Sequence, residues 1–331
     1  MRIDQHEVSM VLKNILIKKG FNEADAALSA DLLVQNSLDG IYSHGVNRFP
    51  RIVSYLDKGY IKPGNKPECI EAFGALEKWD GNLGMGNTNA KVCMDRAIEL
   101  AKKYGIGCVA LRNTNHWMRG GAYGLQAADS GCIGICWTNT QPNMPAWGAK
   151  DRRIGNNPLI MCLPKKDGHI LVDAAMAQFS YGAIEAAKMA GKQLPVPGGY
   201  DSAGNISQDP AEIEKTWRVL PIGFWKGSGF SIAMDLIAAC LSDGNSTYKV
   251  GCIGEDEYAL SQVLIAIDLS KTIADSEALI NEVLANVKES ERINENAEIL
   301  YPGEKEYQTR CDNIKNGIPV NDEVWNKILS L

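Results

Sequence analysis

The sequence of 331 residues contains 34 lysines and arginines and 40 aspartates and glutamates, which gives a net charge of −6 at pH 7. This acidic balance, without any block of basic residues, argues against binding to nucleic acid or to an anionic membrane surface. Hydrophobic residues make up 45% of the chain, as in globular proteins, and no run approaches the roughly 18 apolar residues of a membrane span.

The N-terminal part of the chain is predicted to form three helices. Asp4 caps the first helix, and Gly20 ends it. Asn22 caps a second helix, and the third carries Pro50 in its first turn, where proline is tolerated. The apolar side of the second helix is expected to contain Ala27, Leu28, Leu32 and Leu33.

From about residue 68 onward, short apolar runs alternate with helical patterns, which predicts an α/β fold. Helices are predicted over residues 89–103, 230–241, 276–291 and 324–329, and buried strands over 106–111, 132–138, 158–163 and 263–267. The irregular spacing of these strands favours a mixed sheet over a purely parallel one. We expect three segments: a helical N-terminal segment (1–70) that carries His44 and Arg48, a mixed α/β core (71–304) with an excursion near 195–220, and a C-terminal segment (305–331) that packs back on the N-terminal helices.

The cysteines and the first residues of the chain bear on the cellular compartment. Nine cysteines are scattered along the chain, several of them within apolar runs, which indicates buried free thiols in a reducing compartment. The first residues are too charged for a secretory signal peptide. We therefore expect a cytoplasmic protein without disulfides, and no metal site is predicted.

Two of the four histidines lie in unusual surroundings. His44 follows the second predicted helix, and an imidazole suits proton delivery to a carbonyl oxygen near neutral pH. Arg48 comes four residues later, on the same face if the segment is helical, and a guanidinium can hold a substrate carboxylate. This pair suits a 2-oxo or 2-hydroxy acid, but the two residues can equally well brace the turn.

His116 directly follows a predicted strand, and strand ends are where ligand sites form in α/β proteins. Its alternative interpretation is a half-buried histidine bonded to a backbone carbonyl. Asp173 has two interpretations as well, since its carboxylate can accept a ribose hydroxyl or cap the next segment.

Glycine-rich stretches do not reveal a Rossmann fingerprint. Residues 105–110 match G-x-G-x-x-A, but they follow a helix and open a strand, whereas the fingerprint requires the reverse order. Residues 225–229 (WKGSG) lead into a predicted helix, where free backbone N–H groups and Lys226 can meet a phosphate. The alternative for this stretch is a tight entry turn.

Four strings resemble the signature of the type-2 malate/L-lactate dehydrogenase family, and the resemblance extends over essentially the whole chain. The strings are residues 42–50 (YSHGVNRFP), 154–158 (IGNNP), 225–229 (WKGSG) and 302–304 (PGE). Within this family, residues 115–121 (NHWMRGG) and 136–139 (CWTN) resemble a branch that reduces a diketo sugar acid.

The resemblance implies a mixed-sheet NAD(P)-binding core of non-Rossmann type and a homodimer with active sites near the subunit interface. NADH is the preferred cofactor, and NADPH is possible. His44 is then the proton donor, and Arg48, His116 and Ser43 bind substrate. The residues implied in cofactor binding are His169, Ile170, Leu171, Val172, Asp173, Ala174, Ala175, Trp225, Lys226, Gly303, Glu304 and Lys305.

We therefore expect an oxidoreductase that reduces a small 2-oxo sugar acid with NAD(P)H. Two alternatives stay open. The first is another reductase of the family, acting on malate, lactate, ureidoglycolate or a cyclic imino acid. The second is a protein of the same fold that binds a dinucleotide without catalysis.

Overall fold

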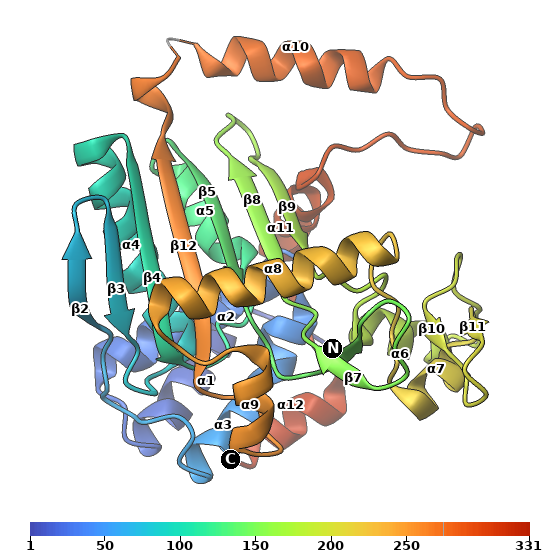
Figure 1. Cartoon of the computed structure of the whole chain (residues 1–331), viewed down its shortest axis with the longest axis horizontal. Coiled ribbons are helices and arrows are strands. Elements are labelled where there is room, and N and C mark those ends of the chain that lie inside the picture. The colour runs from blue at the N-terminus through green and yellow to red at the C-terminus, as the bar shows by residue number, and fades with distance from the viewer. Residues whose placement is uncertain (274) are drawn as a thin grey trace.

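A seven-stranded sheet forms the centre of the computed structural model, which describes residues 1–273 and 275–331 (Figure 1). The order is β2-β3-β4-β12-β5-β8-β9, in which β3 and β4 run parallel and the other neighbours run antiparallel. The strands are β2 (Glu68–Phe73), β3 (Leu76–Asp80), β4 (Ile106–Thr114), β5 (Cys132–Thr138), β8 (Leu159–Leu163), β9 (Ile170–Ala174) and β12 (Leu260–Asp268). The predicted mixed sheet is confirmed.

Helices cover both faces of this sheet. Neighbouring residues of β12 point to opposite faces, because side chains alternate along a strand. Leu264 packs in one buried cluster with Met94 of α4 (Gly86–Tyr104), and α5 (Gly121–Asp129) lies in the same layer. Val263 packs on the other face with Met234 of α8 (Trp225–Ser242).

The N-terminal helices form a third layer with the C-terminal end of the chain. This layer contains α1 (Gln5–Lys18), α2 (Glu23–Leu38), the 3-10 turns η1 (Tyr42–His44) and η2 (Val46–Arg48), α3 (Phe49–Asp57), α11 (Glu304–Asn316) and α12 (Asp322–Leu329). Strand β1 (Arg2–Ile3) pairs with β13 (Ile318–Pro319), and Trp325 and Ile328 share one buried cluster with Leu12 and Leu33. The two ends of the chain are therefore packed into one core.

The remaining elements lie around the ends of the sheet. They are β6 (Met144–Pro145), β7 (Arg152–Ile154), α6 (Tyr181–Met189), β10 (Gly199–Tyr200), β11 (Ile206–Ser207), α7 (Pro210–Thr216), α9 (Thr247–Ile253), η3 (Leu269–Lys271) and α10 (Ser276–Lys288). The elements from α6 to α7 project to one side of the sheet. Helix α10 lies across the end of the sheet that is remote from α3 and α9 (Figure 1).

The predicted helix caps are present. The Asp4 carboxylate accepts the backbone N–H groups of His6 and Glu7, and the Asn22 side chain accepts that of Asp25. Pro50 lies in the first turn of α3, as predicted.

The buried side of α2 differs from the predicted one. Leu33 is buried, but Ala27, Leu28 and Leu32 are only partly covered. The side that faces the core carries the smaller Ala26, Ser29 and Ala30. Small side chains allow close approach to α4, where Ser29 Oγ donates to Asn87 Oδ1 at 3.2 Å in buried surroundings. Close packing and this polar contact therefore outweigh the larger hydrophobic area of the leucines.

The nine cysteines are all free thiols, of which Cys93, Cys132, Cys136 and Cys162 are buried. Cys69, Cys240, Cys252 and Cys311 are exposed, so the predicted burial applies to part of the set. Among the helices of the described residues, none combines the length and the hydropathy needed to cross a lipid bilayer.

Candidate active site

Three chain connections meet at one end of the central strands. Thr114 at the end of β4 pairs with Leu260 at the start of β12, and Thr138 at the end of β5 pairs with Gln262. The residues that follow β4 and β5 and the residues that precede β12 therefore lie close together. They lie at the end that faces α3 and α9 (Figure 1).

The turn that carries His44 is fixed tightly on α2. A Cβ on Gly45 would overlap Ser37 Oγ and lie 2.9 Å from the Leu33 carbonyl oxygen, so only glycine fits there. Asn36 Nδ2 donates to the His44 carbonyl oxygen at 3.0 Å. This explains why a glycine follows the histidine in the string of residues 42–50.

Arg48 does not share a helical face with His44 in the way the spacing suggested. The two residues lie in separate 3-10 turns, η1 and η2, and the backbone of Gly45 between them has φ −111° and ψ −130°. The condition for a shared face, a helical segment through both residues, is therefore not met. The structure nevertheless brings the two side chains together, since the positive charge of Arg48 acts on the imidazole of His44.

His44 and His116 form a stacked pair, with ring centroids 5.6 Å apart and an interplanar angle of 21°. Ser43 Oγ lies 3.0 Å from His44 Nδ1. Burial, together with the positive charges of Arg48 and Arg119, lowers the pKa of His44 to about 4. The imidazole is therefore neutral at pH 7 in the free protein, and an anion bound beside it would raise its pKa.

Arg48 supplies a positive charge in this site that no direct ion pair neutralises among the described residues. Burial and the neighbouring Arg51 lower the pKa of Arg48, and Glu257 acts in the opposite direction. A guanidinium remains charged throughout the physiological range. Among the residues that the structure describes, no carboxylate lies within ion-pair distance of Arg48, so its charge is available to an anionic ligand.

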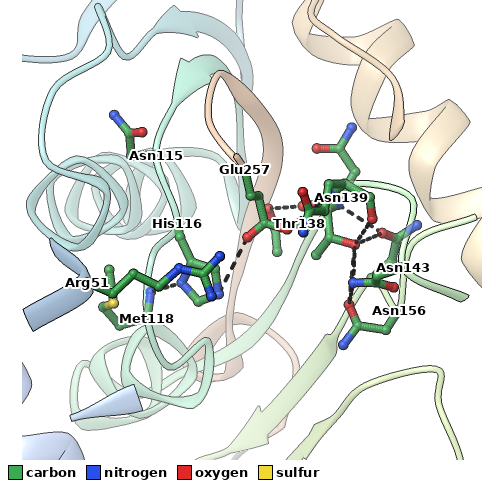
Figure 2. Close-up of polar contacts among 12 residues, drawn as sticks. Arg51, Asn115, His116, Met118, Thr138, Asn139, Asn143, Asn156 and Glu257 are labelled. Carbon is green, nitrogen blue, oxygen red and sulfur yellow. Dashed lines mark hydrogen bonds and ion pairs between the residues drawn. The ribbon is translucent and has the colours of Figure 1, made fainter. Parts of the chain in front are cut away.

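His116 is held in one tautomer between two elements (Figure 2). Its Nδ1 accepts the backbone N–H of Met118 at 2.9 Å, so the ring proton resides on Nε2. Nε2 lies 3.9 Å from Glu257 Oε1, and Glu257 Oε2 accepts the backbone N–H of Gln141 at 3.0 Å. Burial, Arg48 and His44 all lower the pKa of His116.

Glu257 is a site residue that the sequence interpretation missed. Burial raises the pKa of its carboxyl group, and the positive charges of Arg48 and Arg51 act against this shift. The only signal was its position shortly before a predicted strand, and exposed acidic loop residues share that position. The antiparallel register of β12 against β4 brings it to His116, and register is not readable from composition.

The string of residues 154–158 forms a buried polar network beside the site (Figure 2). A Cβ on Gly155 would overlap Asn157 Oδ1 and Thr140 Oγ1. The Asn156 side chain accepts from Asn143 Nδ2 at 2.8 Å, and Asn157 Oδ1 accepts the Thr140 N–H at 3.0 Å. The network fixes the loop after β5, which also carries the backbone that binds Glu257.

The predicted cofactor residues gather along β9, which is an edge strand of the sheet. His169 precedes β9 at the end of the sheet opposite to the active site. Ala174 pairs with Leu159 at the end that carries the active site. Leu171 N–H donates away from the sheet to the Pro302 carbonyl oxygen at 2.9 Å. Backbone groups alternate in direction along an antiparallel strand, so those of Asp173 also face outward. The stretch from residue 169 to 175 thus extends from the opposite end of the sheet to the active site. It includes Ile170, Val172 and Ala175.

The side chains at both ends of this stretch already have protein partners. His169 Nδ1 accepts the Lys165 N–H at 3.1 Å, and its Nε2 lies 2.9 Å from Asp129 Oδ1. Asp173 Oδ2 accepts the Gly121 N–H at 2.8 Å, so this carboxylate caps α5, which precedes it in sequence, and not the following segment. Its second oxygen, Oδ1, accepts no hydrogen bond within the described part of the chain.

The residues around 303 adjoin the start of β9. A Cβ on Gly303 would lie 2.7 Å from the His169 carbonyl oxygen, which requires glycine at this contact. The Glu304 carboxylate accepts from Lys288 Nζ and from the Tyr301 N–H at 3.1 Å, so it stabilises the start of α11. The Lys305 side chain is exposed beside it.

Trp225 and Lys226 lie beyond the other end of β9. Ile222 N–H donates to the Met176 carbonyl oxygen at 2.9 Å, which ties this segment to the residues after β9. Of the two interpretations of residues 225–229, the backbone supports the tight entry turn, because the N–H groups of Lys226, Gly227 and Ser228 donate to carbonyl oxygens of the preceding turn. The indole of Trp225 is 66% exposed, and Lys226 is exposed as well.

These three segments fit a dinucleotide that extends along β9. The outward N–H of Leu171 is bound to Pro302, whereas the outward backbone groups of Asp173 offer hydrogen bonds at the sheet edge. An exposed indole offers a flat surface for a ring, and the lysines at both ends offer positive charge to phosphates. A dinucleotide along β9 would have one end near His44 and His116, at the end of the sheet that carries the active site.

The chain is similar over its full length to known dehydrogenases and reductases. The chain is 46% identical over 333 aligned positions to the 2,3-diketo-L-gulonate reductases of Citrobacter koseri and Escherichia coli, and the alignments cover both chains completely. Among solved structures, the sulfolactate dehydrogenase of Methanocaldococcus jannaschii matches with a TM-score of 0.91 and 30% identity, over 100% of this chain and 98% of that chain. The malate dehydrogenase of Entamoeba histolytica matches with a TM-score of 0.93 and 27% identity, over 100% and 97%.

The family itself follows from a match over nearly the whole sequence. Residues 3–329 match the malate/L-lactate dehydrogenase family. This confirms the resemblance of the four strings, and the sheet explains why no Rossmann fingerprint accompanies them. The chain belongs to the malate/L-lactate dehydrogenase family.

Proposed function

We propose that this protein reduces 2,3-diketo-L-gulonate to 3-dehydro-L-gulonate with a reduced nicotinamide dinucleotide. Membership of the family makes it an oxidoreductase that acts on a CH–OH group. The observation that carries the proposal is the stacked, half-buried pair of His44 and His116 beside Arg48, which forms no direct ion pair. The identity of 46% over the full length to reductases of this substrate supports the choice of the sugar acid.

In this mechanism the side chains hold the substrate and supply a proton. The bound nicotinamide supplies the hydride that reaches the 2-oxo carbon. Arg48 binds the substrate carboxylate, and His44 donates a proton to the oxygen of the neighbouring carbonyl. Ser43 holds Nδ1 of His44, so that Nε2 is directed to the substrate. Proton donation of this kind contributes a rate factor of roughly 10²–10⁴, and orientation contributes further.

The low pKa of His44 links proton uptake to substrate binding. The free protein keeps the imidazole neutral because burial, and then the positive charges of Arg48 and Arg119, lower its pKa. A carboxylate that binds to Arg48 removes much of this repulsion and favours the imidazolium. The proton donor is therefore charged when an anionic substrate arrives.

The cofactor is proposed to be NADH, with NADPH as the alternative. His169 to Ala175, Trp225 and Lys226, and Gly303 to Lys305 are proposed to bind it along β9. Binding there leaves the reactive ring near His44, since β9 terminates at the end of the sheet that carries the site.

A homodimer in the cytoplasm, with a role in carbohydrate metabolism, completes the proposal. The outer side of α8 supports the dimer, because Phe230, Leu236 and Ile237 are 57%, 55% and 45% exposed. Leu279 and Val283 of α10 are both 53% exposed. Exposed apolar surface of this extent is typical of subunit interfaces.

The test is oxidation of NADH by the purified protein, followed by the loss of NADH absorbance. The substrates are 2,3-diketogulonate, pyruvate, oxaloacetate and a cyclic imine, and each is repeated with NADPH. Fast turnover of the diketo acid alone is expected. Turnover of another substrate alone would replace the sugar acid and retain the mechanism. Binding of NADH without turnover of any substrate would indicate a binder without catalysis.

A further inference from the structure

Glu257 lies in the active site, although neither proton transfer nor carboxylate binding uses it. The residue is 7% exposed, and its Oε2 accepts the Gln141 N–H. Its Oε1 faces His116 Nε2 at 3.9 Å, which is too long for a hydrogen bond. In the described part of the chain Oε1 accepts no hydrogen bond, so an accessible acceptor on a buried residue is left for another molecule.

The loop that carries Glu257 is built against the same segment as Arg48. Tyr55 Oη, on α3, accepts the backbone N–H of Glu257 at 3.3 Å. The ring of Tyr258 stacks on that of Tyr60, with centroids 4.5 Å apart and an interplanar angle of 7°. The carboxylate is therefore held in place independently of any ligand.

The pair of Glu257 Oε1 and His116 Nε2 suits a hydroxyl group that lies beside both atoms. His116 Nε2 carries the ring proton and is a donor, whereas Glu257 Oε1 is an acceptor. A hydroxyl oxygen about 2.9 Å from Nε2 and about 2.7 Å from Oε1 would accept from the first and donate to the second. A hydroxyl can do both at once, since it is donor and acceptor.

A carboxylate in the same position fits poorly. It has no proton to donate to Glu257, and it would place a second negative charge against a buried one. Like charges that meet in a desolvated site are strongly unfavourable. The charge of Glu257 would therefore discriminate between 2-oxo acids that end in a hydroxyl group and those that end in a second carboxylate.

We infer that Glu257 is a specificity-determining residue that binds a hydroxyl on the part of the substrate beyond the 2-oxo group, and that it excludes 2-oxo dicarboxylates. The inference rests on the proposed function, because it places the first carboxylate at Arg48 and the carbonyl at His44. The substrate then extends toward His116 Nε2 and Glu257 Oε1.

The test uses two substrates of equal length that differ only at the far end. Oxaloacetate ends in a carboxylate, and 4-hydroxy-2-oxobutanoate ends in a hydroxyl. We expect Glu257→Gln to raise the ratio of kcat/KM for oxaloacetate to that for the hydroxy acid by at least about tenfold. The amide oxygen still accepts the Gln141 N–H, while the amide NH2 replaces Oε1 with a donor and removes the negative charge, so both effects favour a carboxylate over a hydroxyl. Glu255→Gln, an exposed neighbour in the same loop, is the matched control and leaves the ratio unchanged.

An unchanged ratio in Glu257→Gln, with both substrates reduced, would overturn the inference. If the wild type reduces neither compound, the dissociation constants of malate and 2,4-dihydroxybutanoate for the enzyme–NADH complex give the same ratio by calorimetry. An unchanged binding ratio is equally decisive against Glu257. Failure of the proposed function is separate, because it is the absence of diketogulonate turnover by the wild type, whatever the ratio does.

Discussion

At the scale of single residues, the positive surroundings of His44 decide when it carries a proton. Arg48 and Arg119 act on an imidazole that is already poorly solvated. A group in such a position is neutral until an anion arrives, so the acid is produced by binding. Three predictions about individual residues follow from this environment and from the charge of Arg48.

Replacement of His44 by alanine should lower kcat by roughly 10²–10⁴-fold, because the proton donor is lost. The dissociation constant of NADH should change little, since His44 lies at the end of the cofactor path. Stopped-flow turnover and fluorescence titration measure the two quantities. The exposed His6→Ala on α1 is the control. Near-normal turnover of the variant would remove His44 from the mechanism.

Replacement of Arg48 by alanine should raise KM for 2-oxo acids by roughly 10- to 150-fold, the equivalent of one charged hydrogen bond. Steady-state kinetics over a range of substrate concentrations measure this effect. Arg153→Ala, whose side chain is 72% exposed, should leave KM unchanged. A KM that does not move in the Arg48 variant would contradict the carboxylate contact.

Binding of a non-reducible 2-oxo acid analogue such as oxamate should take up a proton at neutral pH. The anion raises the pKa of His44 from about 4, so the imidazole is protonated in the complex and neutral before it. Calorimetry in buffers with different ionisation enthalpies counts this proton. The uptake should disappear in His44→Asn. A binding enthalpy that is the same in all buffers would exclude the coupling.

At the scale of elements, α8 separates two roles along one helix. Its inner side packs on the sheet through Met234 and Ala238, and its outer side presents Phe230, Leu236 and Ile237 to solvent. A helix that is apolar on both sides is normally buried on both sides. The outer side is therefore the part of the molecule on which the proposed dimer is most easily tested.

Leu236→Glu should dissociate the dimer, because the charge would be buried in an apolar interface. Light scattering after size-exclusion chromatography measures the molar mass. Val92→Glu is the control, since Val92 is also exposed but lies on α4, on the other face of the sheet. If the wild type and Leu236→Glu have the same molar mass, this side of α8 is not the interface.

The sequence predicted the central elements well and the peripheral ones poorly. Strands β4, β5, β8 and β12 are buried apolar runs, and all four were predicted. Strand β2 was missed because every one of its residues is exposed, so no alternation marks it. Helix α5 was missed because it is rich in glycine and alanine. It packs closely on the sheet, where a Cβ on Gly124 would lie 2.8 Å from Ile160.

The candidate site was predictable only in part, for a related reason. His44, Arg48 and His116 stand out as scarce or charged residues at turns and strand ends. Glu257 and the backbone of Gln141 belong to the site only because β12 enters the sheet between β4 and β5. Such long-range pairing leaves no local pattern, so the acidic half of the site could not be predicted.

At the scale of the whole molecule, the buried histidines make stability depend on pH. The folded chain holds the pKa of His44 near 4, compared with an ordinary value of 6.5. Between these values the unfolded chain binds a proton that the folded chain does not. Stability is therefore fully present above about pH 6.5 and decreases as the pH falls toward 4. The lowered pKa of His116 acts in the same direction.

The free energy of unfolding should thus be lower at about pH 5 than at about pH 7.5, with about 2 kcal/mol of the difference due to His44. Urea unfolding at the two values measures it. His44→Asn should reduce the difference by that amount, and His6→Asn, on the exposed side of α1, should not. A difference that is equal in the wild type and the His44 variant would contradict the buried neutral imidazole.

The position of β12 has a consequence for synthesis of the chain on the ribosome. This strand lies between β4 and β5, yet it begins only at Leu260. Until it emerges, the edges of β4 and β5 that will bind it have no partner, and each is a hydrophobic strand open to pairing with other chains. The sheet therefore cannot be completed until most of the chain, up to Leu260 and the rest of β12, has been translated. Slow elongation ahead of residue 260 would favour aggregation, and trigger-type holding chaperones would be most needed over that interval.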